Sequence, residues 1–364
     1  MKIVDLKVHA IKPFGSVRNN SRWKKKKNVF SFVKITTDEG VEGCAVSSLP
    51  GGNPMALESV IEFIKPEIIG KDPLDRELIY YILNFTGPFF RINRFFNSAI
   101  DCALWDIAGK AAGMPIYKML GAYRDKIPAY ASTLSYDTIE EYIALAHECA
   151  DAGFVAYKIH GFNEPDKDIE LCEAVRAEFP KMELMLDSMG CFERDGALKV
   201  GRALERLNFR YFESPIREED IEGHCMLRRK LDIPISGTEL NLYGFLGYPD
   251  NITRGAVDIV RTFGDYIGGI TPMVKTAHLC EAHHLKNEPH SFGPTLVQAA
   301  HLHVMLAMRN CDFFEVSVPQ GVFDAGMKDV IRVEKDGMIY APTKPGLGYD
   351  IDWDYINENI DRVF

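Results

Sequence analysis

The fold is decided by residues 183–239, which read ELMLDSMGCFERDGALKVGRALERLNFRYFESPIREEDIEGHCMLRRKLDIPISGTE. Three short apolar runs within this stretch lead to an acid, at Asp187, Glu213 and Glu239. The steps between these acids are 213 − 187 = 26 and 239 − 213 = 26 residues. A strand, a loop, a helix and a return loop take about that many residues. The spacing therefore predicts successive parallel strands with crossover helices between them.

The same alternation continues on both sides of this stretch. Apolar runs that end in a charged residue occur at Val155–His160, Val257–Arg261, Leu285–His290 and Asp312–Glu315. Charged residues that recur at the carboxyl ends of parallel strands are typical of a TIM barrel, because the active site of that fold lies there. A doubly wound open sheet is the alternative, but it does not explain acids at one depth around the whole set. We expect a TIM-type α/β barrel of modified (β/α)7β form over residues 123–325.

The sequence on either side of the barrel region predicts further structure. Residues 1–122 combine strand patterns, including a hairpin over Phe30–Ala45, with helical spacing of apolar residues, as in Ser98–Ala112. This segment is expected to form an N-terminal α+β capping domain. Residues 326–364 return to strand character, with a hairpin predicted around the Asp336-Gly337 turn. We expect this C-terminal segment to pack back onto the capping domain.

Composition and charge narrow the class of protein. The 364 residues include 42 Lys and Arg against 52 Asp and Glu, and the net charge of −10 argues against nucleic acid as the main partner. The chain has no apolar run long enough to span a membrane. Met1–Lys12 alternates apolar and polar residues, which indicates a strand rather than a signal peptide, so we expect a cytoplasmic protein. Eight scattered cysteines without a Cys-x-x-Cys pair are predicted to be reduced thiols.

The three acids of the central stretch predict a metal site. Carboxylates that converge on one cavity repel each other and raise their own pKa values. A hard divalent cation relieves this repulsion, and ligation by oxygen alone suits Mg²⁺, with Mn²⁺ as a substitute. Asp187, Glu213 and Glu239 are therefore the predicted metal ligands. The alternative is three unrelated strand-end acids that face solvent or form salt bridges to helices.

Candidate acid and base groups accompany these acids. Lys158 and His160 are two residues apart on a predicted strand, so both point to one face, toward the barrel interior. Either could act as a general base. His290 ends the seventh strand, roughly opposite, and a second His supplies the other half of acid–base chemistry. Glu315 ends the eighth strand and, if protonated, could hydrogen-bond an enolate oxygen. Taken singly, each of these residues has a structural alternative, such as a salt-bridged strand end.

A basic run and two histidine pairs need separate interpretations. Arg22-Trp23 precedes four lysines, and this run is either a solvated loop or a cationic loop that draws in an anionic substrate. On the second interpretation Arg22 and Trp23 are candidate substrate-binding residues. His278 and His283, and likewise His301 and His303, lie in helical patterns, and we predict that both pairs are structural.

These residues together resemble a known family. The chain is similar over essentially its full length to the enolase superfamily, in its mandelate racemase-like branch, which includes many acid-sugar dehydratases. The resemblance rests on five sets of residues, which are Ala99–Lys110 (AIDCALWDIAGK), Lys158-Ile159-His160, the acids Asp187, Glu213 and Glu239, Gly268-Gly269-Ile270-Thr271, and Pro289-His290-Ser291.

The resemblance implies a reaction and residue roles. Mg²⁺ held by the three acids would chelate the substrate carboxylate, and removal of the α-proton would give an enediolate. Lys158 is expected to contact that carboxylate, His160 takes a place where the family often carries a lysine base, and Glu315 matches the strand-eight acid. The leading hypothesis is an acid-sugar dehydratase, a hydro-lyase that eliminates the β-hydroxyl to give a 2-keto-3-deoxy acid.

Other functions stay open at this point. A racemase, epimerase or cycloisomerase of a small carboxylic acid could use the same scaffold and the same enediolate. A non-catalytic metal-binding barrel is the alternative from another class. A small anionic carboxylate is the expected substrate under the leading hypothesis, and relatives are commonly homo-oligomers.

One departure from the family bears on the division of roles. Relatives with a strand-seven His usually carry an Asp on strand six that orients it, and the corresponding residue here is Phe263. Asp265 follows two residues later and could share that strand face. Without its partner, His290 would be less basic, which favours it as an acid and His160 as the base. A racemase needs a base on each face, whereas a dehydratase needs one base and one acid, so the departure favours dehydration.

Overall fold

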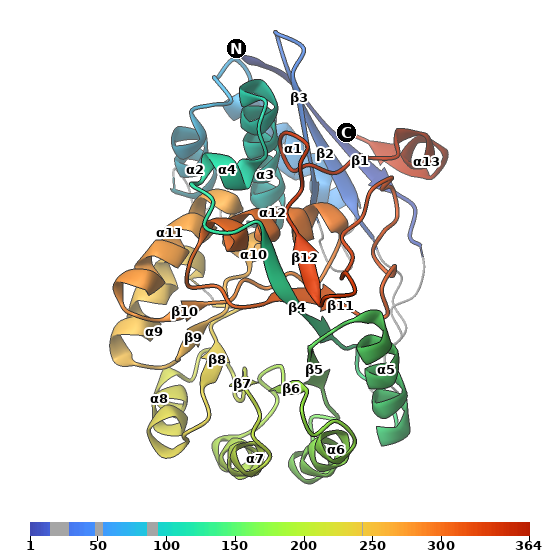
Figure 1. The fold of residues 1–364 in the computed structure, drawn as a ribbon. Helices are drawn as coiled ribbons and strands as arrows, with labels where there is room; N and C mark the ends of the chain where they lie inside the picture. Colours follow the sequence, from blue (N-terminus) through green and yellow to red (C-terminus); the bar gives the residue numbers. More distant parts are fainter. Residues whose placement is uncertain (15–28, 48–53, 86–93, 242) are drawn as a thin grey trace.

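The computed structural model describes residues 1–14, 29–47, 54–85, 94–241 and 243–364 (Figure 1). At one end of the molecule lies an antiparallel sheet with the strand order β13-β1-β2-β3. Its strands are β1 Ile3–Ile11, β2 Ser31–Thr37, β3 Glu42–Ser47 and β13 Ile360–Val363. The hairpin predicted between residues 30 and 45 is confirmed as β2 and β3. β13 pairs with β1, so the end of the described chain lies at the edge of this sheet.

Three helices complete the cap. They are α1 Pro54–Ile68, α2 Arg76–Phe85 and α3 Arg94–Ala112, and the short α4 Ile116–Met119 follows them. α3 is buried along most of its length, because it packs against the cap strands and against barrel helices as well. α2 was not predicted, although its buried residues Ile79, Tyr80 and Leu83 have helical spacing.

The rest of the described chain forms a curled sheet of parallel strands, in the order β10-β9-β8-β7-β6-β5-β4-β11. The strands are β4 Lys126–Ser132, β5 Ala156–His160, β6 Glu183–Asp187, β7 Tyr211–Glu213, β8 Ile235–Gly237, β9 Ile259–Val260, β10 Lys286–Asn287 and β11 Phe314–Ser317. Strand residues are mostly buried, as expected where helices cover the sheet.

Helices follow the strands on the outside of the curled sheet (Figure 1). They are α5 Ile139–Ala152, α6 Pro165–Glu178, α7 Arg194–Arg206, α8 Ile221–Lys230, α9 Tyr248–Arg254, α11 Ile270–Ala282 and α12 Thr295–Ala307, with the short η2 Gly244–Gly247 and α10 Gly264–Ile267 between them. In the described chain no barrel helix follows β11. The next helix, α13 Trp353–Glu358, lies beside the cap sheet instead. This order is the predicted (β/α)7β barrel, while the exact domain boundaries at residues 122 and 325 stay a prediction.

The hairpin predicted around Asp336-Gly337 is wrong. The strand β12, Met338–Tyr340, pairs antiparallel with β4 of the barrel, where Ile339 lies opposite Ile127. Residues 331–334 form no strand, and only Glu334 N donates back to Met338 O, at 2.9 Å. The turn itself exists, since Gly337 has a φ of 78° and its N–H donates to Glu334 O. The second half of the expected hairpin therefore finds its partner in the barrel, not in its own neighbour.

The motif AIDCALWDIAGK joins the cap to the barrel through Asp101. The carboxylate of Asp101 accepts hydrogen bonds from Thr271 N at 2.9 Å and from Thr271 Oγ1 at 2.6 Å. Trp105 Nε1 donates to the same hydroxyl at 2.9 Å. A Cβ at position 269 would lie 2.4 Å from a carboxylate oxygen of Asp101, so this close approach requires Gly269.

Asp106 of the same motif ties the cap sheet to the C-terminal segment. Its two oxygens accept from Cys44 N on β3 at 3.0 Å and from Leu347 N at 2.8 Å. Lys110, one turn later on α3, forms an ion pair with it at 2.7 Å. All eight cysteines are free, as predicted. No helix in the described ranges is long and apolar enough to cross a membrane.

Candidate active site

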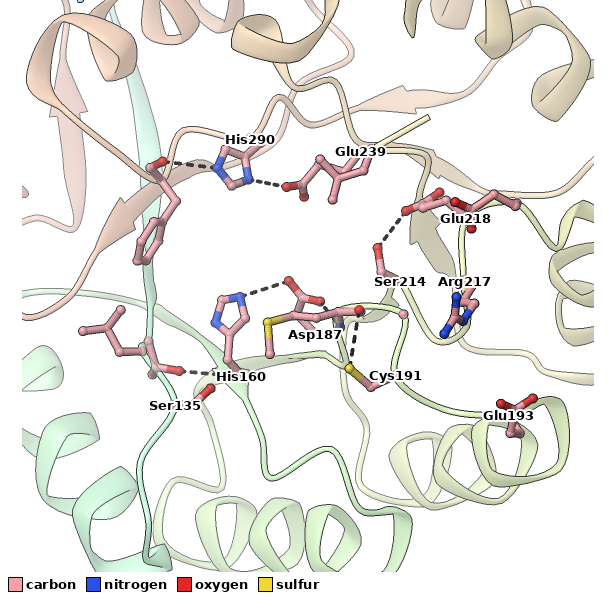
Figure 2. A pocket seen from close by; sticks show the side chains of 17 residues that line it. Ser135, His160, Asp187, Cys191, Glu193, Ser214, Arg217, Glu218, Glu239 and His290 are labelled. Atoms are coloured by element: carbon pink, nitrogen blue, oxygen red, sulfur yellow. Dashed lines mark hydrogen bonds and ion pairs between the residues drawn. The ribbon is translucent and has the colours of Figure 1, made fainter. Parts of the chain in front are cut away.

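A cavity of about 820 Å³ opens at the carboxyl ends of the barrel strands (Figure 2). Four of the predicted site residues line it, namely His160, Asp187, Glu239 and His290. Lys158, Glu213 and Glu315 do not line it and lie beneath, with 1% or less of each side chain exposed. The site therefore has a rim that faces the cavity and a buried floor.

Strand register explains the common depth of these residues. His160 on β5 lies opposite Asp187 on β6, and Asp187 lies opposite Glu213 on β7. The depth predicted from the spacing of 26 residues is thus confirmed for Asp187 and Glu213. On β8 the residue opposite Glu213 is Ser236, so Glu239 lies three residues further along the chain. It reaches the rim from the turn after β8 and not from the strand.

Two acid–histidine pairs form the rim. His160 Nε2 lies 3.0 Å from Asp187 Oδ2, and His290 Nδ1 lies 2.9 Å from Glu239 Oε1. In Figure 2 the two imidazoles lie on opposite sides of the cavity. The ring of Phe292 lies at a similar distance from both imidazoles. Its centroid is 6.3 Å from that of His160 and 6.4 Å from that of His290.

The pairing shifts the pKa values of these groups. Burial raises the pKa of Asp187, but His160 and Lys158 outweigh it, so this pKa lies below its ordinary value. Burial likewise raises the pKa of Glu239, and His290 more than reverses the effect. Burial lowers the pKa of His290, yet the carboxylates of Glu239 and Glu315 raise it above its ordinary value.

The floor is a closed ring of two cations and two carboxylates. Lys158 Nζ lies 3.1 Å from Glu213 and 2.8 Å from Glu315 Oε1. Arg261, from the end of β9, lies 3.0 Å from Glu213 through Nε and 2.7 Å from Glu315 through Nη2. Each carboxylate therefore bridges both cations. Arg261 Nη1 also donates to Tyr130 Oη at 3.0 Å and to a backbone carbonyl.

The ring bears on two predicted roles. Lys158 points inward as predicted, and although burial lowers its pKa, Glu213 and Glu315 raise it well above its ordinary value. Burial raises the pKa of Glu315, but Lys158 and Arg261 hold it well below its ordinary range. This network favours ionised Glu315, so it does not support the protonated role expected from the sequence. In this arrangement the ammonium group of Lys158 pairs with Glu213 and Glu315 in the floor and is not directed into the cavity.

The charges of rim and floor fit a divalent cation. Burial raises the pKa of Glu213, and Arg261 and Lys158 oppose it; with two cations within 3.1 Å of its oxygens, we assign it the ionised form. Four carboxylates then face two permanent cations, which leaves a charge of −2. One divalent ion, or two protonated histidines, balances this charge. Within the described ranges no three His, Cys, Asp or Glu side chains stand together as ligands of one ion, because the rim acids turn toward the histidines.

The departure at position 263 is visible beside His290. The ring of Phe263 packs on the imidazole of His290, with centroids 4.3 Å apart. Asp265 is buried in the short helix α10 and not on the strand. The partner carboxylate of His290 in this structure is Glu239, from the turn after β8, and it raises the pKa of His290, so the expectation that His290 lacks a partner and is less basic is wrong.

Arg261 and Glu218 were not predicted as site residues. Arg261 ends an apolar run, as the acids do, so the rule that selected the acids could have selected it. Glu218 lines the cavity, and its carboxylate accepts from Ser214 Oγ at 2.9 Å and from Thr238 N at 2.6 Å. Burial raises the pKa of Glu218 to about 7. No periodic pattern in the sequence marks this residue.

Backbone strain gathers next to the predicted metal ligands. Met189, Ser214 and Thr238 take φ values of 51°, 39° and 77°, although none is a glycine. Each lies within two residues of Asp187, Glu213 or Glu239 along the chain. Such conformations cost roughly 1–3 kcal/mol each and persist only where the surroundings hold them.

The two histidine pairs that were predicted to be structural, at 278/283 and 301/303, do not line the cavity. His301 and His303 lie on α12, and each accepts a backbone N–H and contacts a backbone carbonyl, which fixes its neutral tautomer. Burial lowers the pKa of each ring to about 4. His278 lies within the outer helix α11, and His283 is the residue that caps the end of this helix. Arg22 and Trp23 fall outside the described residues.

Comparison with known proteins identifies the family. The model of the enolase C-terminal domain-like family matches residues 141–355, and that of the mandelate racemase / muconate lactonizing enzyme N-terminal domain matches residues 10–121. A D-galactonate dehydratase from Pectobacterium atrosepticum is 31% identical, over 90% of this chain and 90% of its own length.

Solved structures agree with this assignment. A mandelate racemase/muconate lactonizing enzyme-type protein from Pseudovibrio sp. is 32% identical with a TM-score of 0.93, covering 100% of this chain and 98% of its own. D-glucarate dehydratase from Agrobacterium tumefaciens, crystallised with magnesium, is 30% identical with a TM-score of 0.89, and all of both chains is covered. The chain thus belongs to the mandelate racemase / muconate lactonizing enzyme family of the enolase superfamily, as an enzyme of the hydro-lyase type that its dehydratase relatives represent.

Proposed function

We propose that this enzyme is a Mg²⁺-dependent acid-sugar dehydratase, which removes the proton α to a carboxylate and then expels the β-hydroxyl as water. The observation that carries the proposal is the pair of imidazoles, His160 and His290, on opposite sides of one cavity, each paired with a carboxylate of the rim. The sugar-acid dehydratases among the relatives support the same substrate class.

Asp187, Glu213 and Glu239 would hold the metal. Their oxygen donors suit Mg²⁺, and the residual charge of −2 in the site matches one divalent ion. Bound there, the ion would neutralise the negative charge that develops on the substrate carboxylate. Mn²⁺ is the expected substitute. Arg22 and Trp23 remain candidates for contact with the anionic substrate, and a homo-oligomer is expected.

We assign His160 as the base and His290 as the acid. His160 is the rim imidazole from strand two, where the family often has its base. His290 packs on Phe263, and its pairing with Glu239 raises its pKa, which favours the protonated form that an acid needs. In the forward reaction His160 would take the α-proton, and His290 would donate a proton to the departing hydroxyl. Both side chains reach the cavity, with 15% and 16% of their surface exposed.

A racemase, epimerase or cycloisomerase is the second candidate, because imidazoles on two sides of a cavity also suit proton transfer on both faces of a substrate. Products separate the two, since only dehydration yields a 2-keto-3-deoxy acid. A non-catalytic barrel would not need two cavity-facing acid–histidine pairs.

The test compares two histidine variants in D2O, after the wild type has been assayed with Mg²⁺ on a panel of sugar acids. His160→Asn should abolish both turnover and exchange of the substrate α-proton. His290→Asn should lower turnover by about 10²–10⁴-fold, the usual contribution of one acid or base, and keep the exchange. Exchange retained in His160→Asn but lost in His290→Asn would reverse the roles. Loss in both variants would favour the racemase.

The metal assignment is best tested at Glu239. Glu239→Gln keeps the shape of a rim ligand but removes its charge, and we expect Mg²⁺ affinity and activity to fall strongly with the fold retained. Glu213→Gln should lower metal affinity too, but it would also break the buried ring with Lys158 and Arg261. Glu219→Gln, on the cavity wall, is the matched control for loss of charge. Equal affinities for Mg²⁺ in Glu239→Gln and the wild type would refute the assignment.

A further inference from the structure

Glu218 connects the ends of two strands that carry predicted metal ligands. It lies in the loop between β7 and α8, on the wall of the cavity (Figure 2). One carboxylate oxygen accepts from Ser214 Oγ at 2.9 Å, and the other accepts from Thr238 N at 2.6 Å. Ser214 directly follows Glu213, and Thr238 directly precedes Glu239. A single side chain therefore bridges β7 and β8 just beyond their ends.

Both residues that Glu218 holds have a left-handed backbone. Ser214 has a φ of 39° and Thr238 a φ of 77°. A β-branched residue such as Thr238 rarely adopts this conformation, so a specific contact must maintain it. Without the bond to Glu218, the Thr238 N–H would lose its acceptor and the turn would be free to relax. The side chain of Glu239 would then change its direction.

The bridge extends to the third predicted ligand through Ser214. The carbonyl of Ser214 accepts from Gly190 N at 2.8 Å and from Ser188 Oγ at 2.9 Å, in the loop that follows Asp187. The N–H of Ser214 donates to Ser236 O at 2.8 Å. Ser214 is thus the point where three strand ends meet, and Glu218 fixes its side chain.

We propose that Glu218 is a positioning residue, which sets the separation of the β7 and β8 ends and so the distance between Glu213 and Glu239. The inference rests on the proposed metal-dependent function, and it needs no contact between Glu218 and the substrate. Glu218 acts on the metal site through the backbone of its neighbours. Its charge is not the required property, whereas its two hydrogen bonds are.

Two variants separate the bonds from the charge. Glu218→Ala removes both bonds. Glu218→Gln removes only the charge, because the amide oxygen can accept from Thr238 N while the amide nitrogen donates to the rotatable hydroxyl of Ser214. Mn²⁺ binding to the full-length, metal-stripped protein is measured from the electron paramagnetic resonance signal of free Mn²⁺. The melting temperature of the metal-free protein is recorded alongside.

We expect Glu218→Ala to weaken Mn²⁺ binding by about 10–100-fold, the usual loss when a residue that supports a metal ligand is removed, and to lower the melting temperature. Glu218→Gln should keep nearly the wild-type affinity, outside that range of about 10–100-fold. Ser214→Ala, which removes one bond, should give a smaller loss. Thr238→Gly in the Glu218→Ala background should restore part of the affinity, because glycine adopts a positive φ without strain.

Three outcomes would overturn the proposal: equal losses in Glu218→Ala and Glu218→Gln, unchanged Mn²⁺ affinity in Glu218→Ala, or no recovery with Thr238→Gly. Failure of the proposed function has a different signature. A wild type that binds Mn²⁺ but dehydrates no sugar acid would contradict the proposed substrate class, while the comparison of variants at position 218 would still decide the role of Glu218.

Discussion

Replacing Arg261 with methionine tests the buried ring beneath the cavity. The change removes the partner of Glu315 at 2.7 Å and of Glu213 at 3.0 Å, and it leaves Lys158 as the sole cation for two fully buried carboxylates. Removing one partner of a buried ion pair typically costs about 3–5 kcal/mol, because the other charge stays desolvated. Tyr130 Oη and a backbone carbonyl also lose a donor. We expect the free energy of unfolding to fall by at least about 3 kcal/mol.

The assay is urea unfolding of the wild type, Arg261→Met, Glu315→Gln and the double variant. Each single variant unbalances the ring, whereas the double variant leaves one cation, Lys158, facing one carboxylate, Glu213. The double variant should therefore be less destabilised than the sum of the singles by about 0.5–3 kcal/mol, the range found for directly interacting residues. Additive losses, or a loss below about 1 kcal/mol in Arg261→Met, would refute the view that the ring acts as one unit.

Two further changes test buried carboxylates outside the cavity. Burial raises the pKa of Glu288 from 4.5 to about 7, so the folded state favours the neutral form of this carboxyl group. The contribution of Glu288 to the stability of the folded protein is therefore fully present below pH 4.5, and it is lost as the pH rises through about 7. Glu288→Gln should remove this loss of about 3 kcal/mol, and equal pH dependence of urea unfolding in variant and wild type between pH 5 and 8 would contradict it. Asp106→Ala removes the acceptor for Cys44 N and Leu347 N, and it should lower the free energy of unfolding by about 3 kcal/mol. The chain near Leu347 should also become open to limited proteolysis. An unchanged cleavage pattern would show that Asp106 does not anchor this segment.

The sequence predicted the barrel because its repeating unit is regular. A step of 26 residues placed Asp187 and Glu213 at one depth, and their register confirms it. Glu239 follows Glu213 at the same spacing, but it does not lie at the same depth on its strand. It reaches the rim because a turn at Thr238 carries the chain beyond the end of β8. The tail hairpin failed because the partner of β12 is β4, which lies about 200 residues earlier in the chain, and local turn chemistry does not reveal such a partner.

The periodicity of the sequence could not predict which side chains pair inside the barrel. Periodicity gives the depth and the face of a residue, but not which residue from across the barrel it meets. Arg261 was visible as a charged strand end, yet its contacts with β7 and β11 depend on closure of the curled sheet. Glu218 lies in an irregular loop, where neither depth nor face can be assigned from spacing.

The pairing of β13 with β1 has a consequence for folding during synthesis. Val363 lies opposite His9, a sequence separation of 363 − 9 = 354 residues. The ribosome must therefore produce the whole barrel before this edge of the cap sheet can be covered. Until then β1 presents unpaired backbone groups to other nascent chains, and such an open edge invites aggregation. The contact that covers this edge of β1 can thus form only after the barrel has been made.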